Sequence, residues 1–158
     1  VGTTFTVELP LAWTDAVPAS PKAKAVSLKG VPVLLAEDND LNAEITTMLL
    51  EKEGMVVTRA ADGEQVVEIF KNAPAEAFAV ILMDIMMPKL DGYAAAQAIR
   101  TLEGRADGRT IPIIALSANV FAEDIEASKA AGMDAHLSKP LEVGKLIAAI
   151  SQLYGRRE

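Results

Sequence analysis

The sequence AVILMD, at residues 79–84, is an unbroken apolar run that ends on a carboxylate. A strand that is apolar at every position is typically buried on both faces, as in a parallel sheet covered by helices on both sides. The run therefore predicts a central strand over residues 80–83. Four further segments predict strands, at residues 33–36, 55–58, 113–116 and 133–137.

Apolar residues at helical spacing follow these strands and predict five helices. Asp62 would be the N-cap of the second helix, and the fourth helix, over residues 123–131, would end at Gly132. The apolar faces consist of Leu41, Ile45, Met48 and Leu49 in the first helix; Val66, Ile69 and Phe70 in the second; Tyr93, Ala96 and Ile99, pointing inward, in the third; and Val143, Leu146, Ile147, Ile150 and Leu153 in the last. Five strand–helix repeats with short joins predict an α/β domain with a doubly wound parallel sheet.

The composition excludes several classes of function. The chain has 158 residues, 51% of them hydrophobic, and a formal net charge of −7, which disfavours contact with nucleic acid. Cysteine is absent, which excludes thiolate metal sites and fits a cytoplasmic location. No apolar run is long enough to cross a bilayer, so no membrane contact is expected.

Polar residues gather where the predicted strands end. Ligands of open parallel sheets bind beyond the carboxyl ends of the strands. The polar residues there are Glu37 and Asp38, Asp84, Ser117 and Lys139. Any one of them alone would usually be a cap or turn residue, but together they place three carboxylates, a hydroxyl and an ammonium on one rim. Such a cluster needs a cation, and Mg²⁺ suits carboxylate and phosphate oxygens.

Four motifs in this order resemble the receiver domains of two-component signalling. They are LLAEDN at residues 34–39, MDIMMP at 83–88 with DG at 91–92, ALSA at 115–118 and LSKP at 137–140, and the resemblance covers residues 31–154. It implies a flavodoxin-like fold with five strands in the order 2-1-3-4-5 and five helices. It also implies that Asp84 accepts a phosphoryl group from a phosphohistidine.

The resemblance implies the roles of the other site residues. Asp38, Asp84 and the backbone carbonyl of Met86 would bind Mg²⁺, and Glu37 would act through water. Lys139 would pair with the phosphoryl group, Ser117 would turn inward to meet it, and the Lys139–Pro140 peptide would be a candidate for the cis form. His136 stands where receivers commonly have a switching Tyr or Phe. A switching role and a solvated surface histidine both stay open for it, whereas a role as phosphodonor is not expected.

Residues 2–10 resemble the last strand of the ATP-binding domain of histidine kinases. We therefore expect a kinase remnant at residues 1–10, a proline-containing linker at 11–30 and the receiver domain at 31–158, as at the carboxyl terminus of a hybrid histidine kinase. The expected partner is a histidine phosphotransfer protein or the kinase core. It would dock around Asn39, Asn42 and Pro140.

Three alternatives remain. The first is an interaction module that is never phosphorylated. The second is a Mg²⁺-dependent phosphohydrolase, although such enzymes commonly carry a second acid where this chain has Met86. A nucleotide or flavin binder on the same fold is disfavoured because no glycine-rich phosphate-binding motif is present. Without an ATP site, the fragment is not expected to be a kinase by itself.

Overall fold

A computed structural model of the chain describes residues 27–118 and 121–155. The predicted kinase remnant at residues 1–10 and most of the linker at 11–30 lie outside the described residues. Leu28 is buried in the same core cluster as Val33, so the core includes a residue of the predicted linker.

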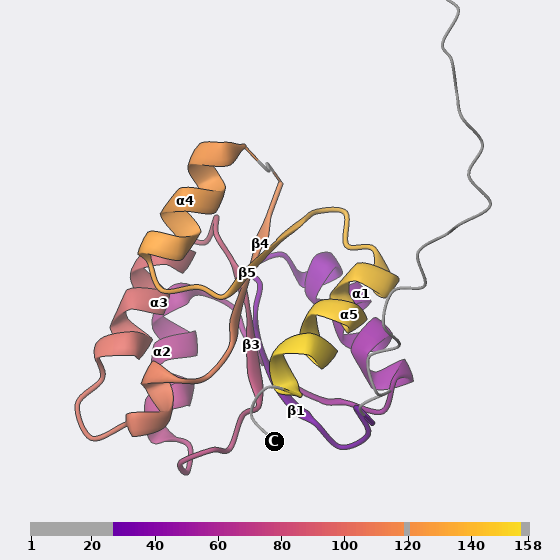
Figure 1. Ribbon diagram of the computed structural model, residues 1–158, viewed down its shortest axis with the longest axis horizontal. Coiled ribbons are helices and arrows are strands. Elements are labelled where there is room, and N and C mark those ends of the chain that lie inside the picture. Colours follow the sequence, from indigo (N-terminus) through magenta and orange to yellow (C-terminus); the bar gives the residue numbers. More distant parts are fainter. Residues whose placement is uncertain (1–26, 119–120, 156–158) are drawn as a thin grey trace, which may run out of the picture.

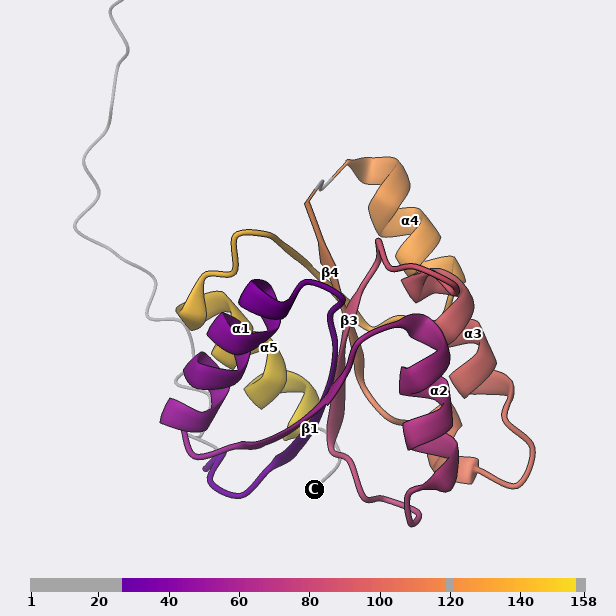
Figure 2. The same ribbon diagram turned by 180° about the vertical axis from the view of Figure 1, so that it is seen from behind.

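Five parallel strands form one sheet in the order β2-β1-β3-β4-β5, which confirms the predicted topology. The strands are β1 (Pro32–Ala36), β2 (Val56–Ala60), β3 (Val80–Asp84), β4 (Ile113–Ser117) and β5 (Ala135–Ser138). The helices are α1 (Asp40–Lys52), α2 (Gly63–Asn72), α3 (Gly92–Thr101), α4 (Ala122–Ala130) and α5 (Val143–Tyr154), with a short 3-10 helix η1 (Ala106–Arg109). Figures 1 and 2 show α1 and α5 on one face of the sheet and α2, α3 and α4 on the other.

The central strand is buried as the AVILMD run predicts. All five residues of β3 are buried, and its side chains alternate between two core clusters, one on each face of the sheet. Ile81 and Met83 belong to the same core cluster as Phe70 of α2, while Leu82 belongs to that of Leu50 of α1. Each large apolar side chain buried in this way contributes roughly 1.5–3 kcal/mol to stability.

The start of β5 differs from its predicted position. The apolar pattern placed the strand at residues 133–137, but β5 begins at Ala135. Gly132 adopts a positive φ of 86°, and the amide of Met133 donates to the carbonyl of Ser128 in α4. Met133 is therefore buried as part of the turn that leaves α4, and not as part of the ladder.

The apolar face predicted for the first helix is not the buried one. Leu41 and Met48 are each 64% exposed, and Ile45 is 49% exposed. The helix instead buries three residues that lie about one turn apart: Ala43, Thr46 and Leu50. The sheet therefore contacts a narrow stripe formed by these three side chains. Leu41, Ile45 and Met48 remain on the surface, and we call them the α1 apolar strip.

Arg105 and Asp107 connect the end of α2 to the segment after α3. Arg105 makes two hydrogen bonds to the carboxylate of Asp107, of 2.9 and 2.8 Å, and its guanidinium lies over the ring of Phe70. It also donates to three backbone carbonyls at the end of α2, those of Phe70, Lys71 and Ala73. Burial alone would raise the pKa of Asp107, but the hydrogen bonds from Arg105 outweigh it and hold that pKa far below its usual range.

Asp107→Asn is expected to lower the free energy of unfolding by about 2 kcal/mol at pH 7, because the charged partner of a buried guanidinium is lost. The folded-state pKa of Asp107 lies below its ordinary value of 3.8, so its ionised form stabilises the fold above that pH. This contribution is lost as the pH falls from there towards the folded-state pKa. The difference in the free energy of unfolding between Asp107→Asn and the wild type should therefore shrink below about pH 4.

Urea unfolding across this pH range measures the effect. Glu68→Gln, an exposed change on α2, is the control and should alter stability by less than about 0.5 kcal/mol. If the free energy of unfolding of Asp107→Asn differed from that of the wild type by the same amount at every pH, the role of the ionised carboxylate would be contradicted.

Candidate functional site

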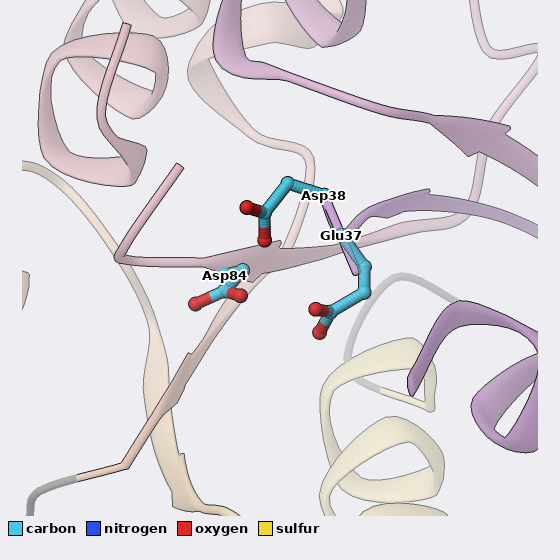
Figure 3. Close-up of side chains that lie close together, drawn as sticks. All are labelled: Glu37, Asp38 and Asp84. Carbon is cyan, nitrogen blue, oxygen red and sulfur yellow. The ribbon is translucent and has the colours of Figure 1, made fainter. Parts of the chain in front are cut away.

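Three carboxylates meet at the carboxyl end of the sheet. Glu37 and Asp38 follow β1, and Asp84 is the last residue of β3, which pairs with β1. One oxygen from each carboxylate lies within 4.8 Å of the others. Figure 3 shows these three side chains close together at the ends of the two neighbouring strands. The parallel pairing of β1 with β3 brings together residues that are 46 or 47 positions apart in the sequence.

Lys139 supplies the positive charge of this cluster. Its Nζ lies 2.6 Å from Oδ2 of Asp84 and 2.5 Å from Oε2 of Glu37. Its backbone amide donates to the carbonyl of Ser117, and the Lys139–Pro140 peptide is cis, which confirms that expectation. Burial alone would lower the pKa of Lys139, but the hydrogen bonds to Asp84 and Glu37 outweigh it, so the pKa lies above its ordinary value. The ammonium therefore stays charged at neutral pH.

The three carboxylates have different surroundings. Glu37 is only 1% exposed, and its Oε1 accepts from the backbone amide of Asn39 and from Nδ2 of Asn42, each at 3.3 Å. Asp84 is buried, and its Oδ1 accepts from the amide of Met86 at 3.0 Å. Asp38 is exposed, and its carboxylate accepts no hydrogen bond from any described residue. Two acids are thus held by side-chain contacts, while the third faces solvent.

Gly92 allows α3 to begin directly beside the site. A Cβ at this position would lie 2.3 Å from the carbonyl oxygen of Asp84, so a larger residue cannot fit without moving the end of β3. The preceding residue, Asp91, caps α3 by accepting from the amide of Ala94 at 2.8 Å. The DG pair at residues 91–92 therefore fixes the backbone of Asp84 from the side of α3.

Ser117 lies on β4, next to β3, and His136 lies on β5, next to β4. Ser117 ends β4, is buried, and stands one residue beyond the position that pairs with Asp84. His136 pairs with Ala115 in the sheet, and its Nδ1 lies 2.9 Å from Oγ of Ser128 in α4. Ser128 also donates to the carbonyl of Asp124. His136 is therefore partly buried in a contact between β5 and α4.

One residue at this rim was missed by the sequence analysis. Arg59, near the end of β2, donates to the backbone carbonyls of Glu37 and Asp38. The sequence feature that could have indicated Arg59 is a charged residue directly after a predicted edge strand. It was not assigned to the site because the position of β2 beside β1 rested on the resemblance and not on the residue pattern.

The comparison with known families agrees with this geometry. The sequence model of the response regulator receiver domain matches residues 33–151. The chain belongs to this family. Receiver domains of this kind occur in histidine kinases and response regulators, and the fold and the acidic rim are consistent with a phosphoacceptor role in a phosphorelay.

The relatives of this receiver domain include several much longer histidine kinases. The peroxide stress-activated histidine kinase mak1 of Schizosaccharomyces pombe is 39% identical over 122 residues, and the sensor protein GacS of Pseudomonas syringae is 32% identical over 130 residues. These alignments include 77% and 82% of the chain, but only 7% and 14% of the respective relatives. The chain therefore corresponds to a small part of each relative.

A solved receiver domain has the same architecture. The receiver domain of the sensor histidine kinase PA1611 from Pseudomonas aeruginosa is 37% identical and superimposes with a TM-score of 0.71. The match covers 80% of this chain and 98% of that one, and a magnesium ion is coordinated in the active-site cleft of that structure. Among the described residues of the present chain, no helix has the length and apolar character needed to span a bilayer.

Proposed function

We propose that this receiver domain accepts a phosphoryl group on Asp84 from a phosphohistidine, with Mg²⁺ bound at the acidic rim. The observation that carries the proposal is the contact of one ammonium, Lys139, with both Asp84 and Glu37, while Asp38 stays open to solvent. A carboxylate that is buried, oriented and next to a fixed cation is suited to phosphoryl transfer, which depends mainly on alignment and charge neutralisation.

The transfer balances as a displacement at phosphorus. A carboxylate oxygen of Asp84 forms the new O–P bond, while the P–N bond to the donor imidazole breaks and its electron pair stays on the imidazole nitrogen. The ammonium of Lys139 stabilises the negative charge on the phosphoryl oxygens. Ser117 would donate to another of these oxygens. The amide of Met86 keeps the Asp84 carboxylate oriented through its Oδ1.

The residues of the rim fit a divalent cation. Three carboxylates and one ammonium leave two negative charges, which a divalent ion would balance. Asp38, Asp84 and the carbonyl of Met86 would hold the ion, with Glu37 acting through water, because Mg²⁺ prefers oxygen ligands and keeps several waters. When bound, Mg²⁺ supplies charge neutralisation to the transferring phosphoryl group.

Phosphorylation is proposed to reach the rest of the domain through Ser117 and His136. Ser117 would turn towards the phosphoryl group, and His136 would change its contact with Ser128. The hydrogen bond between His136 and Ser128 supports this proposal because it joins the switch position in β5 to α4.

A small phosphodonor tests the proposal directly. The wild-type chain is incubated with acetyl phosphate in the presence of Mg²⁺ or of a chelator, and its intact mass is measured. We expect the mass of one phosphoryl group to be gained only with Mg²⁺, and the modified residue to be Asp84. Absence of the gain, with the fold intact, would instead support a module that is never phosphorylated. Rapid turnover of unrelated phosphate esters would support the phosphohydrolase.

We further propose that the chain is the receiver of a hybrid histidine kinase in the cytoplasm and that it docks its donor on α1. A groove of about 410 Å³ runs beside the site between α1 and the segment after Lys139. It is lined by Glu37, Asn42, Ile45, Thr46, Leu49, Lys139, Pro140 and Leu141. The α1 apolar strip borders this groove through Ile45. An apolar surface next to the phosphoacceptor suits a helical histidine phosphotransfer domain or a kinase core.

Ile45→Glu is expected to slow phosphotransfer from a phosphorylated histidine phosphotransfer domain by about tenfold or more, because a charge would replace an apolar contact in the interface. Phosphorylation by acetyl phosphate should stay unchanged, since the small donor needs no docking. Val56→Glu is the matched control: Val56 is 57% exposed but lies at the start of β2, at the opposite end of the sheet. Equal losses in both variants would argue against docking on α1.

A further inference from the structure

Arg59 binds the backbone of the loop that carries two of the three acids. Its Nε and Nη2 donate to the carbonyl oxygen of Glu37 at 3.3 and 3.2 Å, and Nη2 also lies 3.4 Å from the carbonyl oxygen of Asp38. The same Nη2 pairs with Oδ1 of Asp40 at 2.7 Å. One guanidinium from β2 thus contacts the two residues that follow β1, at positions 37 and 38, and Asp40, the first residue of α1.

This backbone contact matters most for Asp38. Glu37 is held through its side chain by Lys139 and Asn42, and Asp84 by Lys139 and the amide of Met86. The carboxylate of Asp38 has no such contact with the described residues. Its position beside Asp84 therefore depends on the conformation of its own backbone. Arg59 is the side chain that donates to the carbonyl of Asp38.

We propose that Arg59 is a positioning residue for the divalent cation: by binding the carbonyls of Glu37 and Asp38 it holds the Asp38 carboxylate where it can ligate the ion. The inference rests on the proposed function, because it requires Mg²⁺ at this rim. Arg59 touches no reacting atom in this scheme and acts only through Asp38.

Charge and geometry predict opposite effects on Mg²⁺ affinity when the Arg59 guanidinium is removed. Loss of a cation near an acidic cluster should by itself strengthen binding of Mg²⁺, because the local potential becomes more negative. Loss of the backbone contact should weaken binding, because residues that orient a ligand typically contribute about 10–100-fold to metal affinity. The ion pair with Asp40 is exposed, with 93% of the Asp40 side chain accessible, and is expected to contribute little.

Arg59→Met tests the proposal because methionine keeps an unbranched stem but removes every donor. We expect the Mg²⁺ dissociation constant, measured by calorimetry or by the amide shift of Met86, to rise about tenfold. Arg59→Lys, which keeps the charge but has a single ammonium in place of the forked donors, should also weaken binding. The rate of phosphorylation by acetyl phosphate should recover towards the wild-type value at saturating Mg²⁺.

Two controls separate positioning from other effects. Asp40→Asn removes the exposed ion pair but leaves the carbonyl contacts, so Mg²⁺ affinity should change by less than about twofold. Val57→Ala loses buried surface on the same strand and should lower stability without changing Mg²⁺ affinity. Mg²⁺ binding by Arg59→Met that is equal to or tighter than wild type would overturn the proposal, as would full restoration by Arg59→Lys. Failure of the wild-type chain to bind Mg²⁺ would instead overturn the proposed function and the inference together.

Discussion

Asp84→Asn is expected to abolish Mg²⁺-dependent phosphorylation by acetyl phosphate. The amide is a poor nucleophile and carries no negative charge, so no O–P bond forms at this position. Asparagine has the same shape as aspartate, and its oxygen can still accept from the amide of Met86. The amide NH₂ would then replace the oxygen that contacts Lys139, which puts two donors face to face. Loss of activity therefore comes with a small local change and not with unfolding.

Two further aspartate variants make this result specific. Asp91→Asn is the matched control, because Asp91 lies seven residues away on the same rim and asparagine is an equally good helix cap. It should be phosphorylated like the wild type. Asp38→Asn keeps the nucleophile but removes a proposed ligand of Mg²⁺, so its phosphorylation should need more Mg²⁺. Intact mass spectrometry distinguishes the three, and a full phosphoryl gain in Asp84→Asn would place the acceptor elsewhere.

The strand pattern of the chain was readable because the central strands are buried on both faces. The AVILMD run leaves no polar position inside β3, so a helix surface or an exposed strand would not produce it. The first polar residue after such a run has to lie at the carboxyl end of the sheet. That simple rule located Asp84, and the structure places Lys139 2.6 Å from its Oδ2.

Features that depend on tertiary contacts were less predictable. The apolar residues of α1 are spaced as a core face, but the sheet packs against the stripe of Ala43 and Leu50, and the α1 apolar strip stays exposed. The spacing of apolar residues indicates that a helix has an apolar face, but it does not indicate which element packs against that face. Likewise, the Arg59 side chain donates to a backbone carbonyl, that of Glu37, 22 positions away. Every residue has such a carbonyl, so the sequence does not indicate which one accepts.

Lys139→Met is expected to reduce the rate of phosphorylation by acetyl phosphate about 100-fold, because the ammonium that would stabilise a phosphoryl oxygen beside Asp84 is lost. Binding of Mg²⁺ should not weaken with it. The ammonium contacts both Glu37 and Asp84, so its removal leaves the acidic rim more negative and favours a cation there. Activity and metal affinity are thus expected to move in opposite directions.

The stability of the same variant should depend on Mg²⁺ more strongly than that of the wild type. Glu37 is 1% exposed in the wild-type chain, and loss of Lys139 removes the charged partner of its buried carboxylate, which destabilises the folded chain. A divalent ion would restore part of that stability by mass action. Lys145→Met, which breaks only an exposed pair with Glu142, is the matched control and should behave like the wild type in each assay. If Lys139→Met lost Mg²⁺ binding and activity in parallel, Lys139 would be a structural support of the metal site and not a partner of the phosphoryl group.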